Sequence, residues 1–283
     1  MDPVPVTAPA PDWLGACRRA TEGLRAVLRD HPTSRERVVE TGETGEGGDR
    51  TLVIDDLAEK MVFAELDALH AQGHRFTALS EERGEVSYGD PSVRVVIDPI
   101  DGSLNAKRGL SAHALSIAVA DGPTMADVVF GFVHDLGTEE EWSAALGAGA
   151  FLDGVRIDAP PERRTADGRI EVLAIESAHP HWIIEAGPAL ADLAHRIRAL
   201  GSTALSLCQV APARVDGMVT LWRCRSVDAA AAQLIVRESG GHVAFPGAAT
   251  PLGAPLDLQP HHPVVAARSA ETLARLLDVP VGR

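Results

Sequence analysis

The sequence predicts a mixed α/β protein that folds as a layered sandwich with two sheets. Short apolar strands cluster in the first half of the chain, whereas strands and helices alternate in the second half. The change falls at the proline-rich stretch 159–164. With 283 residues, of which 45% are hydrophobic, the chain can bury one large core or two closely packed halves. We therefore expect one domain over 13–283, with an α+β half to about residue 158 and an α/β half from about residue 165.

The first half is expected to hold two helices followed by a run of strands. Apolar residues recur at helical spacing over 13–29, and His31-Pro32 ends that helix. The stretch 40–49 is rich in Gly and Glu and predicts a mobile loop, after which a second helix begins near Asp55 or Asp56. The predicted strands cover 76–79, 93–97, 114–120 and 128–133, and 141–152 forms a hairpin that closes this sheet.

In the second half, strands and helices alternate. Strands are expected at 170–175, 217–222 and 264–267. Helices are expected at 189–197, 204–210, 227–239 and 272–277. No internal repeat is visible, so the chain is not a solenoid or an array.

Bulk composition excludes several classes of protein. The 26 basic and 40 acidic residues give a net charge of −14, and without a Lys/Arg run we expect no nucleic-acid partner. Cys17, Cys208 and Cys224 have neither metal nor disulfide spacing, which favours a reducing cytoplasm. The proline-rich stretch 1–12 predicts a disordered tail rather than a signal peptide. No apolar stretch approaches a membrane span, so we expect no membrane partner.

The segment 97–105, Ile-Asp-Pro-Ile-Asp-Gly-Ser-Leu-Asn, carries the clearest chemical signal. Asp98 and Asp101 leave a strand end together, with the Ile100 carbonyl between them, and such closely packed oxygen ligands suit Mg²⁺. Gly102 and Ser103 follow where a helix could start, so their N–H groups could hold a phosphate oxygen. This combination is suited to hydrolysing a phosphate ester. For an isolated motif of this kind, a helix-capping pair is the alternative.

Two further segments, one before and one after 97–105, add to this signal. Residues 79–84 read Leu-Ser-Glu-Glu-Arg-Gly, and 226–241 run from Ser-Val-Asp-Ala-Ala-Ala-Ala to Glu-Ser-Gly-Gly. With 97–105 they resemble the Gly-Glu-Glu, Asp-Pro-Ile-Asp-Gly-Thr/Ser and Trp-Asp-x-Ala-Ala…Glu-Ala-Gly-Gly motifs of the inositol monophosphatase family. That family belongs to the lithium-sensitive, Mg²⁺-dependent sugar phosphatases, alongside the fructose-1,6-bisphosphatases. The resemblance runs from about Trp13 to the C-terminus and implies an α-β-α-β-α sandwich and a homodimer.

The resemblance also implies a set of metal ligands. Glu81, Asp98, the Ile100 carbonyl, Asp101 and Asp228 would bind two or three Mg²⁺ ions. Asp98 would bridge the ions. Carboxylates crowded in this way raise one another's pKa values, and cations offset that repulsion.

Catalytic roles follow from the same resemblance. The Ser103 hydroxyl would pair with an acidic residue on the second helix, and together they would activate the attacking water. Asp55 is the matching residue and Asp56 its adjacent rival. Glu81 is counted as catalytic with Asp55 and Ser103, because it would hold a metal ion at the reacting phosphate.

Two turns are predicted to contact the substrate. The amides of Gly102 and Ser103 would bind the phosphate. The turn Gly201-Ser202-Thr203 resembles one that contacts the substrate in this family, although a strand-to-helix turn with a Ser/Thr cap is the alternative and both can hold.

Departures from the family pattern bear on the choice of substrate. Leu221 stands where the inositol-recognising enzymes of animals carry a Glu. Arg223 and Arg225, as in archaeal and actinobacterial members that resemble fructose bisphosphatase, could present cations to a second anionic group, together with Lys107 or Arg108. We therefore expect inositol 1-phosphate not to be the best substrate. A ligand with a second negative charge, or a larger phosphorylated sugar or nucleoside, is expected to be preferred.

The sequence thus predicts a Mg²⁺-dependent phosphatase that cleaves a small phosphate monoester, such as an inositol, sugar or nucleotide-type phosphate, by metal-activated water and without a phosphoenzyme. A fructose-1,6-bisphosphatase or a 3′,5′-bisphosphate nucleotidase is the alternative within the same class. A regulatory or interaction protein on the same fold is the alternative from another class.

Overall fold

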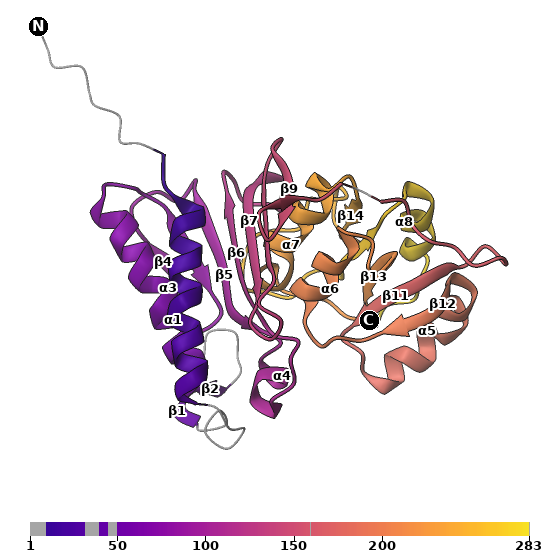
Figure 1. The fold of residues 1–283 in the computed structure, drawn as a ribbon, viewed down its shortest axis with the longest axis horizontal. Coiled ribbons are helices and arrows are strands. Elements are labelled where there is room, and N and C mark those ends of the chain that lie inside the picture. The colour runs from indigo at the N-terminus through magenta and orange to yellow at the C-terminus, as the bar shows by residue number, and fades with distance from the viewer. Residues whose placement is uncertain (1–9, 32–39, 45–49, 159, 283) are drawn as a thin grey trace, which may run out of the picture.

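The computed structural model describes residues 10–31, 40–44, 50–158 and 160–282 (Figure 1). Most of the predicted disordered tail, residues 1–9, lies outside the described residues, as does 45–49 of the predicted loop. Among the described helices, none combines the length and the apolar character needed to cross a bilayer. All three cysteines are buried and unbridged.

Helices and sheets alternate in layers, in the order helix–sheet–helix–sheet–helix (Figure 1). The first layer holds α1 (Trp13–Asp30) and α3 (Val53–Ala71), the middle layer α6 (Thr203–Val210) and α7 (Ser226–Glu238), and the last α5 (Pro180–Leu193) and α8 (Ala270–Leu277). Successive residues of one strand face opposite layers. In the strand Ala114–Ala120, Ala118 packs toward the middle helices, whereas Ile117 packs toward the first layer. The predicted α-β-α-β-α sandwich is confirmed.

The larger sheet has eight strands in the order β10-β9-β8-β7-β6-β5-β3-β4. Its strands are β3 (Thr77–Ser80), β4 (Gly84–Ser87), β5 (Arg94–Asp101), β6 (Ala114–Ala120), β7 (Val128–Asp135), β8 (Glu141–Ala145), β9 (Gly149–Leu152) and β10 (Val155–Arg156). Neighbouring strands run antiparallel, except that β3 and β5 are parallel. A short 3₁₀ helix, Met125–Asp127, precedes β7. The predicted strands are present, and the short edge strands β4 and β10 are additions, too brief to show a pattern.

The smaller sheet has five strands in the order β12-β11-β13-β15-β14. They are β11 (Ile170–Glu176), β12 (Ala194–Arg198), β13 (Gly217–Thr220), β14 (His242–Ala244) and β15 (Val265–Ala267). β12, β11 and β13 are parallel, whereas β15 runs antiparallel to β13 and β14.

Two sequence predictions are wrong. The helix expected at 189–197 instead spans Pro180–Leu193, and residues 194–198 form β12, because pairing with β11 outweighs the local helical spacing. The loop expected from residue 40 contains β1 (Glu40–Thr44), which pairs with β2 (Arg50–Leu52), since ladder hydrogen bonds come from the backbone whatever the composition. The second helix follows β2 directly and starts at Val53.

The middle helix α7 packs closely on the larger sheet through small residues. A Cβ at Gly131 of β7 would lie 2.5 Å from the carbonyl oxygen of Ala231, a distance that no side chain tolerates. The run Ala229–Ala232 is almost fully buried. This close approach carries the first turn of α7, with Asp228, toward the end of β5.

Candidate active site

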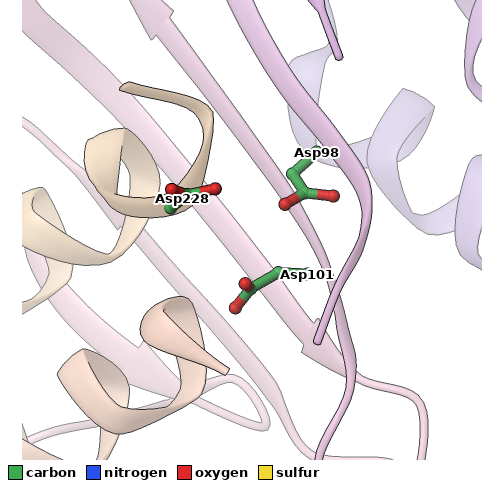
Figure 2. Close-up of side chains that lie close together, drawn as sticks. All are labelled: Asp98, Asp101 and Asp228. Carbon is green, nitrogen blue, oxygen red and sulfur yellow. The ribbon is translucent and has the colours of Figure 1, made fainter. Parts of the chain in front are cut away.

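A β-bulge turns two carboxylates of β5 to the same side. Asp98 pairs with Ser116 and Asp101 with Ala114, so three steps along β5 oppose two along β6. In a regular strand, residues three apart point to opposite faces, and the extra residue removes that difference. Pro99 lies within the irregular stretch, where its missing N–H is tolerated. Asp98 and Asp101 consequently both face α7 (Figure 2).

Asp228 completes a compact group of three carboxylates. It lies in the first turn of α7, where its Oδ2 accepts a hydrogen bond of 2.8 Å from the Arg225 N–H. Oxygens of Asp98, Asp101 and Asp228 all lie within 4.8 Å of one another (Figure 2). An all-oxygen donor set of this size fits a hard divalent cation such as Mg²⁺.

Burial and mutual repulsion disfavour negative charge in this group. Burial, then Glu81 and the neighbouring aspartates, raise the pKa of Asp98 well above its ordinary value. Burial and then Asp228 raise the pKa of Asp101 to about 7. Burial also raises the pKa of Asp228, against the lowering effect of Arg225. Positive charge placed among these carboxylates would favour their ionised forms.

The fourth predicted carboxylate ligand, Glu81, forms an ion pair with the Arg225 guanidinium. Arg225 Nη1 donates to Glu81 Oε1 at 2.6 Å, and Nη2 lies 3.6 Å from Asp228 Oδ1. Burial opposes the charge on Arg225, but Asp228 and Glu81 raise its pKa above the ordinary value. Glu81 therefore lies beside the compact group rather than inside it, and contributes to the field at Asp98.

A small hollow brings together the predicted water-activating residues. Asp55 on α3 and Ser103, the first residue of α4 (Ser103–Arg108), line it together with Glu81 and Asp98. The hollow also contains the other residues that the 97–105 motif and its surroundings contribute, namely Glu82, Pro99, Ile100 and Lys107. The rival carboxylate, Asp56, instead pairs with Lys60 at 2.6 Å on the exposed side of the helix. The geometry thus favours Asp55.

A larger cleft of about 500 Å³ is also lined by carboxylates of the group. Asp101, Asp228 and Arg225 line it, and so do Gly201 and Thr203 of the predicted substrate turn. The middle residue of that turn, Ser202, is the N-cap of α6: its Oγ accepts from the Leu205 N–H at 3.2 Å, and its hydroxyl donates to Asp101 Oδ2. The turn is therefore both a helix cap and a wall of the site.

Glycine is required at Gly102, which precedes α4. Its φ is +82°, and a Cβ there would lie 2.7 Å from the Ala112 carbonyl oxygen and 3.1 Å from that of Gly201. The chain can therefore pass between Ala112 and the substrate turn only with glycine here. The Asn105 and Ala106 N–H groups both donate to the Gly102 carbonyl oxygen. Helix geometry therefore leaves the N–H groups of Ser103 and Leu104 without an acceptor inside α4, as phosphate binding would need.

Three of the residues that were predicted to influence substrate choice lie away from the larger cleft. Arg223 is exposed, with its guanidinium 5.7 Å from the centre of the Trp222 ring, and it is not among the described residues that line the cleft. Arg108 is also exposed. Leu221 is fully buried in the outer core around β11 and β13 and does not reach the cleft.

Sequence reasoning missed three polar residues that support the site. Glu59 on α3 accepts hydrogen bonds from the Ser80 hydroxyl and, at 3.1 Å, from the Arg83 N–H, and so fixes the turn that carries Glu81. Glu176 ends β11 and lines the larger cleft, and Asn105 on α4 bonds to the substrate turn. Their signals were present: Glu59 follows Asp55 by one helical turn, and Glu176 ends an apolar strand.

Known proteins share this fold over nearly the whole chain. A solved inositol monophosphatase-fructose 1,6-bisphosphatase superposes with a TM-score of 0.80 at 22% identity, covering 95% of this chain and all of the other. The extragenic suppressor protein SuhB from Bartonella henselae superposes with a TM-score of 0.76 at 25% identity, covering 94% of this chain and 98% of the other. The model of the inositol monophosphatase family matches residues 13–279. The chain belongs to the inositol monophosphatase family.

Relatives within the family have several names. A fructose-1,6-bisphosphatase/inositol-1-monophosphatase of Methanothermobacter thermautotrophicus is 32% identical, covering 82% of this chain and 83% of the relative. An inositol-1-monophosphatase of Mesorhizobium japonicum is 33% identical over 69% of this chain and 72% of the relative. The Nus factor SuhB of Escherichia coli is 31% identical over 81% of this chain and 82% of the relative.

The raised pKa values predict an unusual pH dependence for the metal-free protein. Between the ordinary pKa of Asp and about 7, the native state binds more protons at Asp101 than the unfolded state does, so the free energy of unfolding falls as pH rises through this window and levels off above it. In EDTA, Asp101→Asn should flatten this dependence, measured by denaturant unfolding between about pH 5 and about pH 8. Asp56→Asn, the same chemical change at a carboxylate outside the group of three, is the matched control. Identical pH profiles for Asp101→Asn and wild type would contradict the account.

Proposed function

We propose that this protein is a Mg²⁺-dependent phosphatase that hydrolyses a small phosphate monoester of a sugar or another polyol. The observation that carries the proposal is the group Asp98, Asp101 and Asp228, whose oxygens converge within 4.8 Å at the edge of a cleft of about 500 Å³. A cleft of this volume matches a small metabolite. Membership of the inositol monophosphatase family, with relatives named for phosphatase activity, supports the same reading.

The carboxylates would hold the ions, and the side chains around them would position the reactants. Asp98, Asp101, Asp228 and Glu81 are the proposed ligands, with two or three Mg²⁺ expected. Bound there, Mg²⁺ lowers the pKa of a water molecule and stabilises charge on a phosphate. The Ile100 carbonyl is proposed as a further oxygen ligand, since Ile100 lines the same hollow.

The proton transfer is assigned to Asp55 and Ser103. Both line the small hollow beside Asp98 and Glu81, so a water molecule there can donate to the Ser103 Oγ and the Asp55 carboxylate. The phosphate would accept from the N–H groups at the start of α4, beyond Gly102. The alcohol portion would occupy the larger cleft, against Gly201 and Thr203.

Arg225 is placed to meet a second anionic group on the substrate. It is the one cationic side chain among the described residues that line the larger cleft, and its present partners are the proposed ligands Glu81 and Asp228. A cation bound by those carboxylates would compete with the guanidinium for them. Arg225 could then turn toward a substrate phosphate or carboxylate. A bisphosphate such as fructose 1,6-bisphosphate therefore stays in the proposed range.

A regulatory role is the second candidate, because relatives of similar identity are named Nus factor SuhB. A binding role alone gives no physical reason to crowd three carboxylates, two of them buried, within 4.8 Å of one another, where burial raises their pKa values. Phosphate release separates the two candidates.

The first test is a screen for released phosphate. Inositol 1-phosphate, fructose 1,6-bisphosphate and nucleotide phosphates are offered with Mg²⁺, and at least one should be hydrolysed, with inositol 1-phosphate not the best. Activity should vanish with EDTA and return with Mg²⁺, and Asp228→Asn should lower kcat by orders of magnitude while the protein stays folded.

Arg225→Ala should reduce kcat/KM for the bisphosphate more than the matched change Arg223→Ala. Full activity after metal stripping would exclude the mechanism, and no hydrolysis at all would favour the regulatory role.

A second test addresses the proton acceptor. Asp55→Asn should lower kcat by ~10²–10⁴-fold, as expected for a lost general base. Ser103→Ala should lower kcat more than it raises KM, since its contact matters mainly in the transition state. Asp56→Asn is the matched control one residue away and should retain near wild-type turnover. If Asp56→Asn is inactive while Asp55→Asn turns over normally, the base is assigned to the wrong residue.

A further inference from the structure

Glu176 is a buried carboxylate beside the proposed metal site that has no part in the group of three. It ends β11, is only 4% exposed and lines the larger cleft. Burial raises its pKa, although the donors around it oppose that shift. Burying a carboxylate is unfavourable unless hydrogen bonds compensate, so the contacts of this side chain indicate what it does.

The hydrogen bonds that the Glu176 carboxylate accepts from the described residues come from Leu200 and Gly201, where the substrate turn begins, and from α6 behind it. The Leu200 N–H donates to Oε1 at 2.9 Å, and the Gly201 N–H lies 3.2 Å from Oε1 and 3.0 Å from Oε2. The Ser206 hydroxyl on α6 donates to Oε1 at 2.5 Å. The carboxylate therefore fixes the N–H side of the Leu200–Gly201 segment.

The opposite side of the same segment is held from the first half of the chain. The Asn105 side-chain amide, on α4, donates to the Leu200 carbonyl oxygen and to the Ala112 carbonyl oxygen, both at 2.7 Å. Gly201, at φ +82°, passes so close that a Cβ would lie 2.7 Å from Asn105 Nδ2. The turn is thus clamped between Glu176 and Asn105, one from each half of the sandwich.

The clamped turn continues directly to a proposed metal ligand. The Ser202 hydroxyl and the Ala204 N–H, the latter at 2.8 Å, both donate to Asp101 Oδ2. Because both bonds use Oδ2, they restrict the rotation of the Asp101 carboxylate and leave Oδ1 as the oxygen that could bind a cation. Any shift of the turn would rotate Asp101 or remove its donors.

We propose that Glu176 is a positioning residue for Asp101, acting through the turn 200–204. By fixing Leu200 and Gly201, it holds Ser202 and Ala204 against Asp101 Oδ2 and so keeps Oδ1 oriented for a divalent cation. This inference rests on the proposed metal-dependent function. Partners that orient metal ligands typically affect metal affinity by about 10–100-fold.

The test compares cation binding in three variants by titration calorimetry with Mg²⁺ and with Mn²⁺. Glu176→Ala should weaken binding by about 10–100-fold and lower kcat with little change in KM. Glu176→Gln should recover part of the affinity, because its amide oxygen can still accept from Leu200 and Gly201. Asp216→Ala is the matched control: Asp216 is 2% exposed and also accepts from two backbone N–H groups, of Arg163 at 2.7 Å and Val172 at 2.9 Å, at the opposite end of the same sheet.

The control separates positioning from stability. Both Ala variants should lower the melting temperature, but only Glu176→Ala should lose cation affinity. Wild-type affinity in Glu176→Ala, or an equal loss in Asp216→Ala, would overturn the inference. If Glu176→Ala does not fold, Glu176→Gln decides, and unchanged affinity and kcat there would overturn it as well. A wild-type protein that binds Mg²⁺ yet hydrolyses no phosphate ester would contradict the proposed phosphatase alone, because affinity is measured without substrate.

Discussion

The repulsion among three crowded carboxylates, two buried and one half-buried, is the constraint on which the rest of the site depends. Asp98 and Asp101 come from the end of β5, and Asp228 comes from the start of α7 in the adjacent layer. Burial raises the pKa of each. Each is held by one main-chain N–H, from Ile100 at 3.0 Å, Ala204 at 2.8 Å and Arg225 at 2.8 Å respectively. In every case the main-chain N–H uses one carboxylate oxygen, and the second oxygen is the one proposed to bind a cation; that of Asp228 now lies 3.6 Å from Arg225 Nη2.

These main-chain hydrogen bonds to the carboxylates explain why the site needs both halves of the chain. The bulged end of β5 and the start of α4 come from the first half, whereas α6, α7 and β11 come from the second. Contacts such as Asn105 to Leu200 cross from one half to the other, so packing of the two sheets about the middle helices sets the distances in the site. The alanine run of α7 and Gly131 on β7 allow that packing to be close. The packing between the two halves therefore contributes to the stability of the fold and also sets the geometry of the site.

Much of this could be predicted from the sequence, because the residues concerned lie in short local motifs. Asp98, Asp101 and Pro99 share one segment, and a proline within a strand pattern is itself a signal for a bulge. The turn at 201–203 was recognisable as both a cap and a wall. What escaped prediction depends on contacts distant in sequence: the strand at 194–198 exists because β11 lies beside it, and the grip of Glu176 on Leu200 spans 24 residues. The local spacing of residues predicts neither the strand at 194–198 nor the contact between Glu176 and Leu200.

The central claim is that these carboxylates form a divalent cation site, and anomalous diffraction from crystals soaked in Mn²⁺ tests it most directly. The account predicts an anomalous peak in contact with oxygens of Asp98, Asp101 and Asp228, at roughly 2.0–2.3 Å, with Arg225 displaced from Glu81 or Asp228. The same peak should be lost or weakened in crystals of Asp101→Asn. Fully soaked crystals without a peak at these carboxylates, with Arg225 still paired to Glu81 and Asp228, would contradict it.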